Sequence, residues 1–166
     1  RKMTTCKSNI GMTKTEAYLE LKELCNKHGF NKSNSSFLTL LLPPNSEIRQ
    51  EVFLSLVKKF LHGFECIISI EPVVGFSETY ANAHFQEYKD NLPFCHAHII
   101  IKERKNEVRA LKEDWFKLVG SSKKRLFHCT HLREAITSAL DYMTKYFENK
   151  YNASPIFGYS IQEEEI

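Results

Sequence analysis

The pattern of apolar and polar residues divides the chain into alternating strands and helices. A capping box at Thr13–Glu16 opens an apolar stripe of helical period that ends at Gly29. Short apolar runs rich in Ile, Val or Leu read as strands, and longer runs of period 3.6 read as helices. We predict strands over 37–42, 64–74, 94–102 and 126–130, and helices from 14 to 28, from 46 to Gly63, from 108 to Gly120 and from 132 to 147.

The order of these elements predicts the fold class. After the leading helix, the chain runs strand–helix–strand–strand–helix–strand, followed by a last helix. This order is typical of the ferredoxin-like or RRM-like α+β fold, whose sheet is antiparallel with two helices on one face. The other face is then available for a ligand or for the last helix. We therefore predict a βαββαβ sheet with an extra N-terminal helix and a C-terminal helix.

Length and composition fit one domain. The chain has 166 residues, 42% hydrophobic and 26% charged, which is ordinary for a globular protein. No apolar run approaches the roughly 20 residues of a membrane helix, and no apolar segment typical of a secretory signal follows the basic start. We expect a flexible tail over 1–12, one domain over 13–150, and a C-terminal extension with an acidic tail over 151–166.

Net charge and cysteine content bear on the possible partners and on the cellular location of the protein. The net charge of +3 permits a nucleic-acid partner without requiring one. The five cysteines are odd in number and widely spaced, with no CxxC pair. They predict isolated reduced thiols and an intracellular protein, in the nucleus or the cytoplasm according to the host.

His96 and His98 are the sharpest candidates for chemistry. Alternate residues of a strand share a face, so the two imidazoles project together and suit a divalent metal. Glu71, near the end of the preceding strand, supplies an oxygen ligand if the two strands pair. Two interpretations of each residue remain open: a metal ligand, or a structural histidine and a carboxylate that ends its strand before Pro72.

Tyr142 lies on the last predicted helix, away from its apolar stripe, and is therefore not needed for the core. Lys145, one turn later, can reach the same place. A tyrosine is a usable nucleophile when a cation or metal stabilises its phenolate or the attacked group. A YxxK spacing also arises readily by chance, so the spacing alone does not decide. On the first predicted strand, Thr39 faces the histidines if the register allows.

Together and in this order, these motifs resemble the HUH endonucleases, the replication initiators (Rep proteins) of rolling-circle plasmids and small single-stranded DNA viruses. The resemblance spans about 37–146 and rests on three segments: Phe37–Leu40, His96–His98 and Tyr142–Lys145. This sequence departs from the family pattern at Ala97, because the family usually has a bulkier residue between the two histidines. Tyr146 also suggests the two-tyrosine arrangement of Helitron-type transposases.

The resemblance implies a nicking and joining enzyme for single-stranded DNA. Glu71, His96 and His98 would hold Mg²⁺ or Mn²⁺, and Tyr142 would form a 5′-phosphotyrosine, with Lys145 stabilising charge and Tyr146 as the second-choice nucleophile. The expected partners are an origin hairpin, an additional helicase domain and host replication factors, and no membrane. Candidates for DNA contact are Thr39, Lys102, Arg104, Lys105, Lys123, Lys124 and Arg125.

Three alternatives remain. The chain is a transposase or relaxase with two tyrosines, a non-catalytic RRM-like module that binds nucleic acid, or a metal-dependent hydrolase that uses water. The RRM-like module normally carries a Lys/Arg-Gly-Phe-type signature, which this sequence lacks. The hydrolase would leave no covalent protein–DNA adduct.

Overall fold

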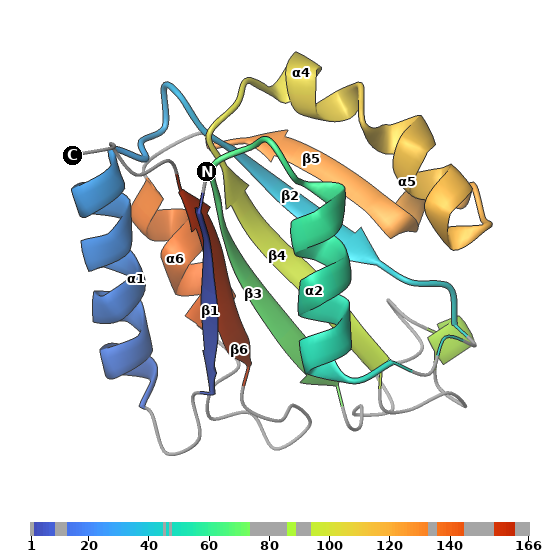
Figure 1. The fold of residues 1–166 in the computed structure, drawn as a ribbon, viewed down its shortest axis with the longest axis horizontal. Helices are drawn as coiled ribbons and strands as arrows, with labels where there is room; N and C mark the ends of the chain where they lie inside the picture. The colour runs from blue at the N-terminus through green and yellow to red at the C-terminus, as the bar shows by residue number, and fades with distance from the viewer. Residues whose placement is uncertain are drawn as a thin grey trace.

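A computed structural model describes residues 2–8, 13–73 except 45 and 47, 86–88, 94–132, 136–144 and 155–161. Within these residues, six strands form one antiparallel sheet in the order β1-β6-β3-β4-β2-β5 (Figure 1). The strands are β1 (Lys2–Ser8), β2 (Ser36–Leu41), β3 (Cys66–Val73), β4 (Phe94–Ile101), β5 (Phe127–His131) and β6 (Ile156–Ile161).

The helices connect and cover the strands. They are α1 (Lys14–His28), α2 (Gln50–Phe60), α4 (Lys105–Arg109), α5 (Lys112–Val119) and α6 (Ile136–Thr144), with short 3₁₀ turns η1 (Gln86–Tyr88) and η2 (Lys124–Leu126). The predicted capping box is present, since the Thr13 hydroxyl accepts a hydrogen bond from the Glu16 amide at 3.1 Å. Gly29 ends α1 with φ of 72°, a conformation that glycine adopts without a Cβ penalty.

The central part of the sheet confirms the predicted fold class. Strands β2 to β5 lie in the order β5-β2-β4-β3, with α2 after the first strand and α5 before the last. This is the βαββαβ arrangement of ferredoxin-like folds. One predicted helix differs: the segment from 108 to Gly120 belongs to two short helices, α4 and α5, which are separated at Ala110 and Leu111.

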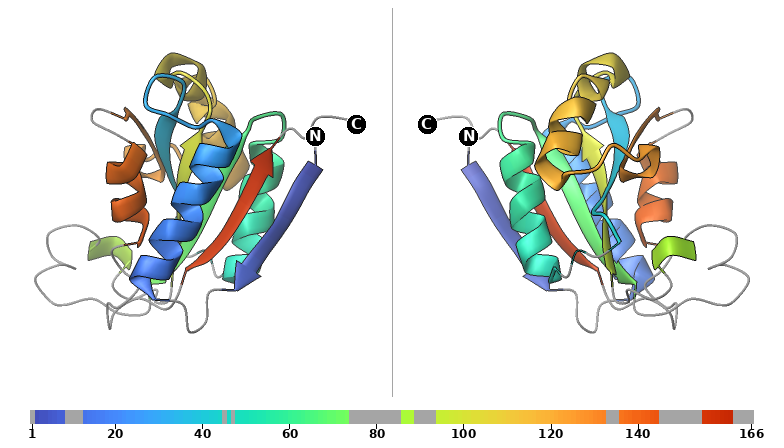
Figure 2. Two further views of the ribbon diagram at one scale, coloured as in Figure 1. Left: turned by 90° about the vertical axis from the view of Figure 1, so that its left-hand side faces the viewer. Right: turned by 90° about the vertical axis from the view of Figure 1, so that its right-hand side faces the viewer.

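Helices cover both faces of the sheet, α1 and α6 on one side and α2 on the other (Figure 2). One core joins the sheet to α2 and α5 through residues such as Leu40, Phe53 and Trp115. A second core joins Ile67 and Ile100 to α1 and α6. Because both faces are covered, every residue of β4 is buried, and its histidines lie inside the molecule.

The sequence-based domain limits omit two strands. Residues 1–12 were expected to form a flexible tail, yet Lys2–Ser8 pairs with β6. Residues 151–166 were expected to lie outside the domain, yet Ile156–Ile161 pairs with β3. The reason is physical: β3 is almost entirely apolar, and β6 covers the edge that a four-stranded sheet would leave open.

None of the described helices combines the length and the apolar character that a membrane-spanning helix needs.

Candidate metal centre and its surroundings

Glu71, His96 and His98 meet on the sheet face that α1 and α6 cover. In the register of β3 and β4, Glu71 lies opposite His96. Two residues further along the same face, Ser69 lies opposite His98. The Oε2 atom of Glu71 lies 2.8 Å from Nε2 of His96 and 3.4 Å from Nε2 of His98. One donor atom from each residue lies within 4.8 Å of the others, which suits a single metal ion.

Burial and the two imidazoles have opposite effects on the ionisation of the Glu71 carboxyl. Burial raises the pKa of the Glu71 carboxyl, but the charge of His98 and the hydrogen bond from His96 outweigh burial and bring that pKa to about 2. Glu71 is therefore an ionised carboxylate with no exposed surface. Its Oε1 atom has no hydrogen-bond partner among the described residues, which is costly unless a cation occupies the site. The donor set therefore fits a divalent cation, whose identity the side chains do not specify.

Thr39 orients one of the histidines. It lies opposite His98 in the register of β2 and β4, and so on the same face as the histidines, as the sequence predicted for a suitable register. Its Oγ1 lies 3.3 Å from Nδ1 of His98. When Nδ1 donates its proton to this hydroxyl, the lone pair of Nε2 faces Glu71 and is ready for a metal. Thr39 therefore contacts a candidate metal ligand, and the DNA contact predicted for it stays a prediction.

Tyr142 lies next to the same histidine. Its ring meets His98 edge-on, with centroids 5.1 Å apart, and it also contacts Phe37 at 5.9 Å. Phe37 in turn stacks on His98, with centroids 5.6 Å apart. Tyr142 is 42% exposed, whereas its neighbours Leu140 and Met143 are buried in the core and fix the rotation of α6. The helix thus presents a solvent-accessible phenol beside the buried cluster.

Lys145 and Tyr146, the other two predicted catalytic residues, lie outside the described residues. Near Tyr142, α6 is attached to α1 by an ion pair between Lys14 Nζ and Asp141 Oδ1 at 3.3 Å.

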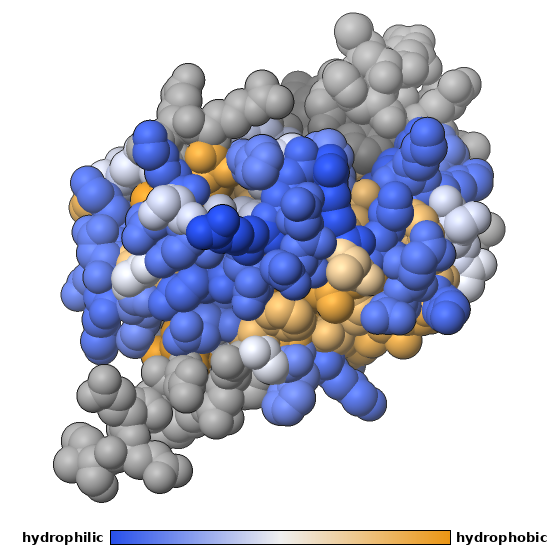
Figure 3. All heavy atoms as spheres, turned by 90° about the horizontal axis from the view of Figure 1, so that it is seen from above, coloured by the Kyte–Doolittle hydropathy of each residue, from blue (hydrophilic) through white to orange (hydrophobic). Residues whose placement is uncertain are grey.

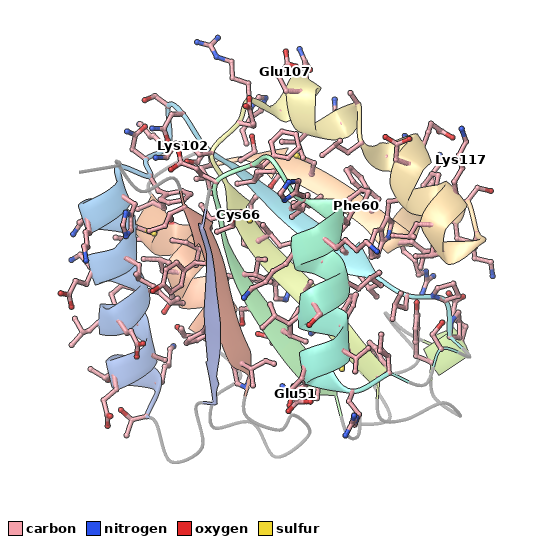
Figure 4. The ribbon with its side chains drawn as sticks, in the orientation of Figure 1. Glu51, Phe60, Cys66, Lys102, Glu107 and Lys117 are labelled. Carbon is pink, nitrogen blue, oxygen red and sulfur yellow. The ribbon has the colours of Figure 1, made fainter. Side chains whose placement is uncertain are left out.

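The cations predicted to bind DNA divide into two groups. Lys102 forms an ion pair with Glu65 at 3.2 Å, donates to the carbonyl oxygen of His28, and lies over the ring of Phe30 at 4.7 Å. It therefore ties β4 to the end of α1, at the upper end of the molecule in Figure 4. Arg125 pairs with Glu87 at 3.2 Å. Both side chains have structural partners.

The remaining four cations form no ion pair with another described residue. Lys123 and Lys124 are exposed just before β5, and Arg104 and Lys105 lie at the start of α4. The two pairs flank the β2–β5 edge of the sheet, because η2 precedes the start of β5 whereas α4 lies near its end.

Three further residues lie around the cluster and were not among the predicted site residues. Phe37 shares a face with Thr39 and stacks on His98, and period-2 alternation along β2 could have indicated it. Ser69 lies opposite His98 and its buried hydroxyl has no hydrogen-bond partner among the described residues. His128 is exposed and lies opposite Thr39 on β5, so its side chain faces the same side of the sheet. Only knowledge of the β2–β5 register could have identified His128.

No protein-family model, no curated protein and no solved structure matches this chain.

Proposed function

We propose that this protein nicks and rejoins single-stranded DNA as an HUH-type endonuclease, with Tyr142 as the nucleophile and Glu71, His96 and His98 as metal ligands. The observation that carries the proposal is the edge-on contact between Tyr142 and His98, with ring centroids 5.1 Å apart. A nucleophile must lie beside the metal that polarises its target. The sequence separates these two residues widely, and the fold brings them together.

The reaction we propose is a transesterification. The phenolic oxygen of Tyr142 forms a bond to phosphorus, and the bond between phosphorus and the 3′ oxygen breaks. The products are a 5′-phosphotyrosine and a free 3′ hydroxyl, and the proton lost by the phenol is regained by that hydroxyl through solvent. A bound Mg²⁺ or Mn²⁺ would supply Lewis-acid polarisation of the phosphate. The covalent bond conserves the phosphodiester energy, so the reverse reaction joins ends without ATP.

The surroundings of Tyr142 support this role. Its ring packs against His98 and Phe37 on the inner side, while its partial exposure leaves the outer side accessible to a strand of DNA. Lys145, one helical turn further along the sequence, is proposed to stabilise the phenolate or the phosphate. In this proposal Thr39 and the four cations Arg104, Lys105, Lys123 and Lys124 contact the DNA.

The test is covalent trapping on a denaturing gel. The protein is incubated with a diverse pool of labelled single-stranded oligonucleotides in Mn²⁺ or in EDTA. We expect a denaturant-resistant protein–DNA band that requires Mn²⁺ and disappears in Tyr142→Phe. Tyr159→Phe is the matched control, because Tyr159 lies on β6 and is partly exposed; it should keep the band.

Each other outcome favours a specific alternative. A band that survives in Tyr142→Phe but not in Tyr146→Phe makes Tyr146 the nucleophile, and a band that needs both favours a two-tyrosine transposase or relaxase. Cleavage without an adduct identifies water as the nucleophile. Binding without cleavage favours a non-catalytic module. That last alternative has less support, because α1 and α6 bury the sheet residues Ile67 and Ile100, which an RRM-like module would expose.

A further inference from the structure

A cavity of about 340 Å³ lies away from the metal cluster, at the end of the sheet where α4 begins. Three cations line it: Lys32 from the loop between α1 and β2, and Arg104 and Lys105 from the start of α4. His131, the last residue of β5, completes the basic lining. This end of the molecule, seen face-on in Figure 3, is mostly hydrophilic.

Among the residues that the structure describes, no carboxylate neutralises the charge of this cavity. Lys32, Arg104 and Lys105 form no ion pair with another described residue. None of the described residues that line the cavity is acidic, although Glu103 and Glu107 are close in sequence. Gathering three like charges without a carboxylate is unfavourable in the empty protein and favourable once an anion enters. Lys102 and Arg125, by contrast, each have a carboxylate partner.

The walls of the cavity are held in place by hydrogen bonds. In the loop that carries Lys32, the Asn31 side chain accepts from the amides of Ser33 and Asn34, each at 3.0 Å, and the Asn34 side chain donates to Gly29 O at 2.8 Å. Across the cavity, Ser36 donates to the carbonyl oxygen of Glu103 at 2.7 Å. A site fixed before binding loses less entropy on taking up a ligand.

We propose that this cavity binds a phosphate group of a nucleotide, either within a nucleic-acid strand or free. Guanidinium and ammonium groups are the donors that recognise phosphate oxygens, and the cavity volume lies in the range of small-ligand sites. Ser36 at the cavity is three residues from Thr39 on β2, so their two side chains lie on opposite faces of the sheet. A DNA strand that contacts both would therefore have to pass around the β2–β5 edge of the sheet. The strand-bound form rests on the proposed function; free phosphate binding does not.

The test compares two double variants that remove the same charge. Arg104→Ala with Lys105→Ala alters the cavity, and Lys22→Ala with Lys27→Ala removes two exposed cations of α1 as the control. Binding of a labelled oligothymidylate is measured by anisotropy in EDTA, where cleavage does not occur. We expect the cavity variant to lose at least about tenfold in affinity at low salt. The slope of log affinity against log salt concentration should become shallower by about 1.4, because two phosphate contacts are lost. The control variant should lose less than about twofold, and circular dichroism checks that both variants fold.

A second experiment distinguishes free phosphate from the phosphate of a nucleic-acid strand. Thermal melting is measured with inorganic phosphate or with chloride at matched ionic strength. If phosphate raises the melting temperature of the wild type but not of the cavity variant, and oligonucleotide affinity is unchanged, the site takes free phosphate or a mononucleotide. If the two variants behave alike in both assays, the proposal is overturned. A cavity effect on oligonucleotide binding in a protein that never forms an adduct would overturn the nicking proposal alone.

Discussion

At the residue scale, the Thr39 hydroxyl lies 3.3 Å from Nδ1 of His98, while Nε2 of the same ring faces Glu71. Valine has a similar size but offers His98 Nδ1 no acceptor. We therefore expect Thr39→Val to weaken Mn²⁺ binding about tenfold, measured by titration calorimetry. Thr130→Val is the control, because Thr130 is a partly buried threonine on β5, opposite Phe37 and not opposite a histidine. Equal affinities in wild type and Thr39→Val would show that the hydroxyl does not orient His98.

Buried thiols make a separate residue-scale prediction about pH. Burial raises the pKa of Cys25 from 9.0 to about 12. Below pH 9 the thiol is protonated in both the folded and the unfolded chain, so its contribution to stability is fully present. As the pH rises from 9 toward 12, only the unfolded chain ionises, and this contribution is lost at about 1.4 kcal/mol per pH unit.

Cys25→Ala removes that group and therefore reduces the alkaline loss of stability. We expect the difference in unfolding free energy between wild type and Cys25→Ala to shift in favour of the variant above pH 9, by up to about 1.4 kcal/mol per unit. Urea denaturation at a series of pH values measures it. A difference that stays constant from pH 8 to pH 11 would mean that Cys25 ionises equally in the two states.

At the element scale, α2 lies against β6 at Gly158. A Cβ atom there would lie 2.9 Å from Leu54 Cδ1 and 2.9 Å from Lys58 Cε. Leu54 is buried, so it cannot move away freely. We expect Gly158→Ala to lower the unfolding free energy by about 1–3 kcal/mol through overpacking.

A double-mutant cycle identifies the cause. Leu54→Ala alone should cost about 2–5 kcal/mol, but it also leaves room for the Cβ at 158. The double variant should therefore cost at least about 1 kcal/mol less than the sum of the single variants, measured by chemical denaturation. Strict additivity would locate the effect of Gly158→Ala elsewhere, for example in the strand backbone.

The same elements explain what the sequence could predict. Capping residues and apolar periods are local signals, so α1 and the strands with Thr39, Glu71 and His98 were identified, and alternation predicted their shared face. The role of β6 was not predicted. Phe157 becomes a core residue only when its strand pairs with another strand that is far away in sequence. The partners of Lys102 were missed for the same reason, since Glu65 and the carbonyl oxygen of His28 are brought to it only by the fold.

At the scale of the whole molecule, the candidate metal centre lies in the middle of the sheet and depends on both of its sides. Glu71 belongs to β3, and β6 pairs with β3 along its outer edge from Cys66 to Ile70. Ile156 and Phe157 of β6 are buried, one in each core. A chain limited to 13–150 would thus expose the apolar edge of β3 and lose apolar packing on both faces.

We therefore expect the 13–150 chain to aggregate, or to unfold without cooperativity, and to lose Mn²⁺ binding together with its fold, because β3 supplies one of the ligands. Size-exclusion chromatography, denaturation followed by circular dichroism, and calorimetric titration with Mn²⁺ test this against the full 166-residue chain. A truncated chain that unfolds cooperatively at the wild-type midpoint and binds Mn²⁺ equally well would show that β1 and β6 are accessory. The loss of both properties together would show instead that the metal centre requires all six strands, and that the smallest functional unit includes both ends of the sheet.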